Sequence, residues 1–178
     1  AAQLIALFQD IRPWDWVFST WRSHYHALLH GIPEAWVWDE IMAGRSMYLC
    51  NKEHRFLSSA LVGGCLPIAV GVAMGIAKLS RAKNGGYSYF KDGKGLYERV
   101  WCFVGDMAAE TGAFHEATKY AGRHNLPITF VVEDNGLSTN TPTQKAWGGG
   151  HSEPVIHSYT YNRTYPHVGA GQYVNFPA

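Results

Sequence analysis

Two apolar segments, each ending in side chains that carry oxygen, constrain the fold of this chain most strongly. Residues 99–104 (Arg-Val-Trp-Cys-Phe-Val) lead directly into Gly105 and Asp106, and residues 128–132 (Ile-Thr-Phe-Val-Val) are followed by Glu-Asp-Asn-Gly at 133–136. A segment rich in small residues, predicted to be a helix over 108–124, lies between them. In a parallel β–α–β unit the carboxyl ends of both strands meet at one edge of the sheet. We therefore expect an α/β fold with a parallel sheet flanked by helices.

The two strand ends carry a set of oxygens that suits Mg²⁺. This ion prefers oxygen ligands and takes only one or two protein side chains, while phosphates and water complete its shell. Asp106 offers a charged oxygen, Asn135 a neutral one, and the turn after Asn135 can add the carbonyl of Leu137. The helix that follows would direct its N–H groups and positive dipole end to a phosphate at the same place. Alternatively, Asp106 caps a helix and Asn135 forms a turn, but their joint position at two strand ends favours the ligand interpretation.

Composition limits the class of protein. The 178 residues suit a single domain over 1–178, and 47% of them are hydrophobic, enough for a sizeable core. Fifteen basic against 14 acidic residues leave a net charge of +1, which gives no electrostatic reason to expect binding to nucleic acid or membrane. Three cysteines without metal-ligand spacing favour reduced thiols and a cytoplasmic location. The chain begins without Met inside an apolar helix, so we expect missing upstream residues, and we expect an extended tail over 148–178.

The other elements are predicted from periodicity and from glycine and proline positions. We expect helices over 1–12, 26–30, 33–42 and 67–78, a strand or extended segment over 15–22, loops over 45–61 and 81–98, and a strand-like alternation over 158–165. The helix over 67–78 is apolar on all sides, which predicts burial all round. Its Gly71 and Gly75 allow close approach of a second helix, either a partner's or the chain's own packing layer.

Five sequence blocks then carry a resemblance to a known family. Gly105-Asp106 and Asn135, 29 positions apart, are similar to the Gly-Asp-Gly…Asn-Asn signature of thiamine-diphosphate enzymes. The remaining blocks are residues 20–31, residues 44–47, residues 60–63 with the following Pro67, and residues 112–117, a helix motif at a subunit contact. By these five blocks taken together, the chain resembles the alpha subunit of thiamine-diphosphate-dependent 2-oxo acid and acetoin dehydrogenases, within the transketolase-like superfamily. The resemblance implies the thiamine-diphosphate-binding fold, specifically its diphosphate-binding domain.

The resemblance implies roles for particular residues. Arg22 would bind the diphosphate, since a guanidinium offers forked donors. The backbone at Ala60 and Val62 would contact the aminopyrimidine and thiazolium part of the cofactor, and the amides of Met107 and Ala108 would face its diphosphate. The full implied cofactor-binding set is Trp21, Arg22, Ala60, Val62, Gly63, Gly105, Asp106, Met107, Ala108 and Asn135. His24 or His26 would act catalytically in the substrate channel, unless these histidines are structural imidazoles.

Some positions depart from the family pattern. Met107 stands where the family usually has Gly, and Asp134 replaces the first Asn of the signature. The segment after Trp147 does not match the family's C-terminal half, where a catalytic His loop lies. His151, His157 and His167 are only candidates for that histidine.

The resemblance also implies a partner. Thiamine diphosphate supplies the carbanion chemistry, and the protein supplies orientation and electrostatics. Activation needs a carboxylate on the aminopyrimidine ring, which a beta-type subunit would supply as Glu in a hetero-oligomer (α2β2) or dimer. The reaction implied is oxidative decarboxylation and acyl transfer on a small 2-oxo acid. The alternatives are a split transketolase-like or 2-oxo acid decarboxylase subunit, acting on a ketose or 2-oxo acid, and a non-catalytic cofactor-binding or assembly module.

Overall fold

A computed structural model of the chain describes residues 2–84 and 98–148. The helices are α1 Ala2–Phe8, α2 His24–Leu29, α3 Glu34–Met42, α4 Cys65–Asn84, α5 Asp106–Ala109, α6 Gly112–Arg123 and α7 Thr143–Trp147. The strands are β1 Trp16–Ser19, β2 Cys50–Asn51, β3 Phe56–Ser58, β4 Val100–Gly105, β5 Ile128–Glu133, β6 Leu137–Ser138 and β7 Thr141–Pro142.

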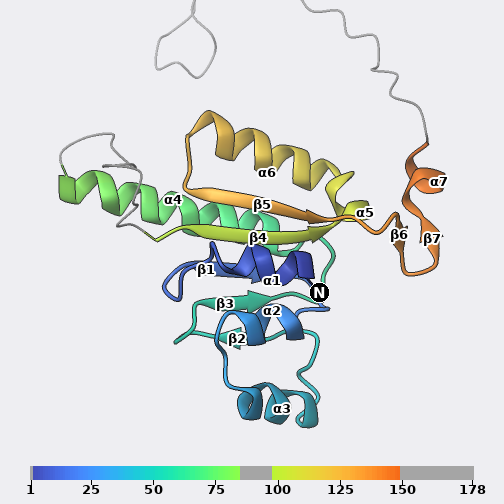
Figure 1. The fold of residues 1–178 in the computed structure, drawn as a ribbon. Coiled ribbons are helices and arrows are strands. Elements are labelled where there is room, and N and C mark those ends of the chain that lie inside the picture. The colour runs from blue at the N-terminus through green and yellow to red at the C-terminus, as the bar shows by residue number, and fades with distance from the viewer. Residues whose placement is uncertain (1, 85–97, 149–178) are drawn as a thin grey trace, which may run out of the picture. The chain divides into compact units, whose positions relative to one another are not determined.

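The main sheet has five strands in the order β2-β3-β1-β4-β5 (Figure 1). β1 pairs in parallel with β3 and β4, and β4 pairs in parallel with β5. β2 joins the sheet antiparallel to β3, and β6 and β7 form a separate antiparallel pair. The prediction of an α/β fold with a mostly parallel sheet flanked by helices is confirmed.

Both faces of the sheet are covered. Successive side chains of a strand point to opposite faces, so one strand contributes to a core on each side. In β4, Val100, Cys102 and Val104 belong to a core with α4 and α6. Trp101 and Phe103 belong to a second core with α1, α2 and α3 on the opposite face (Figure 1). A strand buried on two faces has a continuous apolar sequence, as residues 100–104 do, which explains why β4 can be predicted from the sequence.

The predicted loop over 45–61 is wrong in part, because it contains two strands. β3 pairs with β1 in the register Val17↔Phe56 and Ser19↔Ser58, and β2 pairs with β3. These strands are two and three residues long, too short to show a period of their own. Pairing of β3 with β1, and of β2 with β3, stabilises them, so contacts between distant segments determine the structure here.

The prediction that the apolar helix is buried on every side is also wrong. α4 is longer than expected, 20 residues, and packs one face on the sheet through residues such as Ala69 and Ala73, both 0% exposed. Ile68 and Leu79 are 48% and 63% exposed. Gly71 and Gly75 lie on the exposed face, and an added Cβ would meet nothing within 4 Å among the described atoms. The alanines therefore serve the chain's own sheet, and a helix packed on the glycines stays a prediction.

The single helix predicted over 108–124 is wrong, since two helices occupy this segment. Thr111 has extended backbone angles (φ −79°, ψ 151°) and separates α5 from α6. Its hydroxyl donates to the carbonyl of Ala108 at 2.7 Å, which satisfies one acceptor at the end of α5. α5 has only four residues, so any phosphate contact here comes from individual amides and not from a long helix dipole.

The remaining element predictions can be compared directly. The strands over 99–104 and 128–132, the extended segment over 15–22 and the helix over 33–42 are confirmed. The helices predicted over 1–12 and 26–30 exist with shifted bounds, at 2–8 and 24–29. The predicted loop over 81–98 is helical up to Asn84. Its remainder before residue 98, the tail beyond Gly148 and the three candidate histidines there lie outside the described residues. In the described part, no helix is long and apolar enough to cross a membrane.

Asp15 links the start of β1 to β4 in the core. The residue is 0% exposed, and its carboxylate accepts hydrogen bonds from the backbone N–H of Arg99 at 2.9 Å, the backbone N–H of Arg12 at 3.1 Å and the indole of Trp101 at 3.2 Å. A buried carboxylate with several donors is tolerated because these bonds replace its hydration. The contact to Arg99 joins residues 84 positions apart.

His30 is expected to make the fold less stable as the pH falls below about 6.5. The imidazole is buried, and its Nε2 lies 3.2 Å from the carbonyl of Asp15. Burial lowers the pKa of His30 below its usual 6.5, although the nearby carbonyl and carboxylate of Asp15 partly oppose this. The unfolded chain therefore takes up a proton at a higher pH than the folded chain, so the stabilisation is complete above pH 6.5 and is lost towards the folded pKa. Urea unfolding gives the free energy of unfolding at pH 7.5 and at pH 5.5. Between these two values the His30→Gln variant should lose less of this free energy than the wild type does, and equal losses would contradict the role of His30.

Candidate functional site

The site lies where β4 and β5 end. The register pairs Gly105 with Glu133 as the last residues of the two strands. Asp106 therefore follows the end of β4 directly, and Asn135 follows the end of β5 by two residues. Adjacent parallel strands place these ends side by side, as the sequence predicts.

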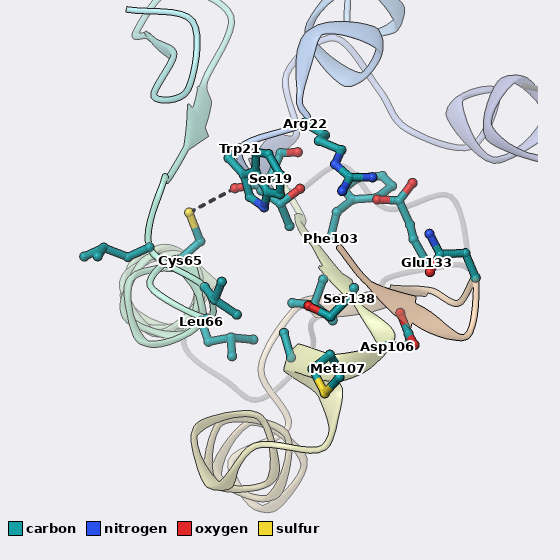
Figure 2. A pocket seen from close by; sticks show the side chains of 18 of the residues that line it. Ser19, Trp21, Arg22, Cys65, Leu66, Phe103, Asp106, Met107, Glu133 and Ser138 are labelled. Carbon is teal, nitrogen blue, oxygen red and sulfur yellow. Dashed lines mark hydrogen bonds between the residues drawn. The ribbon is translucent and has the colours of Figure 1, made fainter. Parts of the chain in front are cut away.

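A cavity of about 240 Å³ opens at this edge of the sheet (Figure 2). Figure 2 shows Trp21 and Arg22 on one side, Asp106 and Met107 on another, and Cys65 and Leu66 on a third. Ten predicted residues line the cavity: Trp21, Arg22, Val62, Gly63, Gly105, Asp106, Met107, Ala108, Asn135 and Leu137. They come from segments far apart in the sequence, and the fold brings them together.

Asp106 is 8% exposed and lines the cavity. Its Oδ2 accepts a hydrogen bond from the hydroxyl of Thr143 at the start of α7. Among the described residues, none donates a hydrogen bond to its Oδ1. One carboxylate oxygen is thus held by the protein, and the other is left for a ligand.

Asn135 lies in a tight turn made by two consecutive side chains. Its Oδ1 accepts the N–H of Leu137 at 2.9 Å, and Oδ1 of Asp134 accepts the N–H of Gly136 at 2.8 Å. Gly136 has φ +69°, a conformation that a residue without Cβ adopts at no steric cost. The turn interpretation of Asn135 is therefore correct. It does not compete with the ligand interpretation, because an amide oxygen has a second lone pair.

Arg22 places a positive charge at the cavity. Its guanidinium carbon lies 4.6 Å from the ring centroid of Trp21, a cation–π contact that limits its orientation. No described carboxylate forms an ion pair with it. The group is therefore available to an anion, and the planar fork suits a phosphate.

The segment Ser59–Gly64 closes another side of the cavity. Leu61, Val62 and Gly63 line it, whereas Ala60 does not. The turn is compact: Gly63 has φ +73°, and a Cβ on Gly64 would lie 2.9 Å from the Cβ of Leu61. This loop presents backbone and exposed apolar side chains, which suits a flat ring better than a phosphate.

The two predicted catalytic histidines are not part of the cavity lining. Neither His24 nor His26 lines the cavity. His24 Nε2 lies 3.0 Å from the hydroxyl of Ser46, which joins two of the sequence blocks. His26 is 2% exposed, and its ring stacks on Phe103 with centroids 4.3 Å apart. Their catalytic role stays a prediction.

His26 makes two further polar contacts. Its Nδ1 lies 2.5 Å from the hydroxyl of Ser19, and its Nε2 lies 3.2 Å from Oε1 of Glu133. Both ring nitrogens are therefore used inside the protein. His26 contacts the cavity lining through its polar partners Ser19 and Glu133 and through the ring of Phe103.

Sequence reasoning missed several lining residues, of which Glu133 has the clearest chemistry. It ends β5 immediately before the turn at Asp134, so its place next to the predicted ligands was a usable signal. The other missed residues are Ser19, Thr20, Leu61, Cys65, Leu66, Phe103, Val104, Ser138 and Thr139. The Cys65 thiol donates to the carbonyl of Ser19 at 3.3 Å (dashed in Figure 2). Burial raises the pKa of this thiol to about 11, so the thiol stays protonated and unreactive near pH 7.

The charges around the cavity fit a metal-bound diphosphate. Asp106 and Glu133 are carboxylates, and Arg22 is the cation of the lining. A diphosphate alone would be repelled by the carboxylates, whereas a divalent ion between them would reverse that interaction. No group of three or more His, Cys, Asp or Glu in the described residues could hold a metal by itself. The available donors are one carboxylate, one amide and backbone carbonyls. They suit an ion whose coordination shell is completed by phosphate oxygens, as that of Mg²⁺ is.

Comparison with known protein families gives a match over the described site. The model of the family described as "Dehydrogenase E1 component" matches residues 1–151. The matched range includes every residue that lines the cavity.

Individual proteins with similar sequences are alpha subunits of two kinds. The alpha subunit of acetoin:2,6-dichlorophenolindophenol oxidoreductase from Bacillus subtilis is 31% identical over 142 residues, which cover 74% of this chain and 38% of that protein. The pyruvate dehydrogenase E1 component subunit alpha of Porphyra purpurea is 33% identical over 132 residues, covering 68% and 36%. The chloroplastic pyruvate dehydrogenase E1 component subunit alpha-3 of Arabidopsis thaliana is 32% identical over 161 residues, which cover 80% of this chain and 36% of that protein. The chain thus spans little more than a third of the length of these relatives.

Proposed function

Because the chain belongs to the dehydrogenase E1 component family, we propose that it is the alpha-type subunit of a 2-oxo acid or acetoin dehydrogenase that binds thiamine diphosphate and Mg²⁺. The observation that carries this proposal is one cavity of the described residues, at the ends of β4 and β5. It is lined by both predicted side-chain metal ligands together with Arg22 and the residues of the diphosphate turn.

The chain's own residues bind and orient the metal ion and the cofactor. Asp106, Asn135 and the carbonyl of Leu137 hold the metal ion, and Arg22 with the amides of Met107 and Ala108 holds the diphosphate. The apolar surface of Leu61 and Val62 excludes water next to the ring system. When bound, thiamine diphosphate would supply the carbanion-stabilising chemistry that decarboxylation and acyl transfer need. Leu66 and Phe103 add apolar walls to the same cavity.

The proposal includes a beta-type subunit. The cavity carboxylates Asp106 and Glu133 lie at the diphosphate-side strand ends, and Asp106 is assigned to the metal. The carboxylate that activates the aminopyrimidine ring is therefore a glutamate of the partner, in an α2β2 or dimeric assembly. We place this assembly in the cytoplasm, with a small 2-oxo acid or acetoin as substrate.

The test is binding by the complete protein with its beta-type partner. The complex is isolated from the native source, and its unfolding temperature is measured with increasing thiamine diphosphate in the presence and absence of Mg²⁺. A ligand that binds only the folded state raises the apparent stability with its concentration, so we expect a rise that requires both components. A complex whose unfolding temperature does not respond to any concentration of the two would refute the proposal.

A further inference from the structure

We propose that Thr143 is a positioning residue that makes the Asp106 site select Mg²⁺ over Ca²⁺. The inference rests on the proposed function, because it takes Asp106 as a metal ligand. It extends that function to a residue outside the cavity lining and to the choice of ion.

Thr143 touches both halves of the site. Its hydroxyl donates to Oδ2 of Asp106, which follows β4. Its backbone N–H donates to the carbonyl of Gly136 at 3.0 Å, in the turn that follows β5 and carries Asn135. One residue thereby connects the two segments that supply the proposed metal ligands.

The helix that Thr143 begins is attached to the site a second time. At the other end of α7, the indole N–H of Trp147 lies 3.0 Å from the sulfur of Met107. The two contacts reach neighbouring residues, Asp106 and Met107, so α7 is held against this turn at both ends. Met107 departs from the glycine usual in the family, and its side chain supplies the second attachment.

The hydroxyl of Thr143 decides how the Asp106 carboxylate can bind a cation. A carboxylate binds Ca²⁺ through one or both oxygens, since Ca²⁺ accepts six to eight ligands in flexible geometry. Mg²⁺ demands a near-octahedral shell, which fits a carboxylate that binds through one oxygen. The hydrogen bond from Thr143 uses one lone pair of Oδ2 and fixes the orientation of the carboxylate, whereas Oδ1 accepts no hydrogen bond from the described residues. Oδ1 is therefore the more available metal ligand, which favours binding through one oxygen, the mode that suits Mg²⁺.

The experiment compares two substitutions in the full protein bound to its beta-type partner. Thr143→Val keeps the size and removes the hydroxyl, whereas Thr143→Ser keeps the hydroxyl. Thr141→Val, on the exposed strand β7, is the matched control for a threonine-to-valine change. Calorimetric titration with Mg²⁺ and separately with Ca²⁺, each at saturating thiamine diphosphate, gives the dissociation constants, and thermal unfolding without ligands verifies folding.

We expect Thr143→Val to weaken Mg²⁺ binding about tenfold, the lower range for loss of a residue that orients a ligand. Ca²⁺ should lose much less, so the preference for Mg²⁺ falls, while Thr143→Ser and Thr141→Val keep the wild-type preference. An unchanged ratio of the two affinities in Thr143→Val overturns the proposal, as does a Thr143→Ser variant that behaves like the valine variant. A wild-type complex that binds neither ion in the presence of thiamine diphosphate instead refutes the proposed function, so the two failures are distinguishable.

Discussion

Replacing Asp106 by alanine is expected to abolish Mg²⁺-dependent binding of thiamine diphosphate. The substitution removes the buried carboxylate at the end of β4 and leaves Asn135 as the proposed side-chain ligand, with Oδ1 already engaged by Leu137. Loss of a charged ligand exceeds the effect of losing an orienting residue, so the affinity should fall about 100-fold or more. Calorimetry of the complex with and without Mg²⁺ measures it.

Glu110→Ala is the matched control for the Asp106 substitution. Glu110 is an exposed acidic residue at the end of the same short helix, and it does not line the cavity. The Glu110→Ala variant should bind the cofactor with the affinity of the wild type. If Asp106→Ala binds cofactor with unchanged affinity and unchanged Mg²⁺ dependence, the assignment of the metal site is wrong.

Replacing Asp15 by alanine should lower the free energy of unfolding more than any other substitution proposed for this chain. Three donors then remain in or near the core without their acceptor: the N–H groups of Arg12 and Arg99 and the indole of Trp101. Each buried donor left without its acceptor costs about 1–3 kcal/mol, so the summed loss is a large share of the stability of a domain. Urea unfolding followed by circular dichroism gives the difference in free energy of unfolding.

Asp10→Ala supplies the comparison for the Asp15 substitution. Asp10 lies in the same connection between α1 and β1, but it is exposed. Its removal should change the free energy of unfolding by no more than about 0.5 kcal/mol. A loss below about 1 kcal/mol for Asp15→Ala would show that the carboxylate does not hold β1 to β4.

The central strands could be predicted from the sequence, whereas the peripheral ones could not. β4 is buried on both faces, so its apolar run is continuous, and Gly105-Asp106 marks its end. β2 and β3 contain two and three residues, and only the pairing of β3 with β1 and of β2 with β3 makes them strands. The exposed face of α4 was unpredictable for another reason, because the apolar residues Ile68 and Leu79 on that face resemble core residues in composition.

Strand ends and sequence blocks predicted which residues come together at one cavity, while their functional roles stay predictions. Asp106, Asn135 and Arg22 line one cavity as expected. The contacts of His26 with Ser19 and Glu133 depend on side-chain packing between distant elements, and no spacing in the sequence encodes them. Thr143 likewise reaches Asp106 only because α7 folds back over the turn, across 37 positions.

The place of β1 in the sheet has a consequence for biosynthesis. β1 is made before both of its neighbours in the sheet, β3 and β4, and the carboxylate of Asp15 accepts a hydrogen bond from Arg99, which lies 84 positions later. Parallel pairing over such sequence distances forms slowly, because the loop entropy is lost before the contacts are gained. Until β4 has left the ribosome, β1 exposes an unpaired edge and apolar side chains of both cores. A nascent chain that contains β1 but not yet β4 is therefore exposed to misassembly until β4 is available.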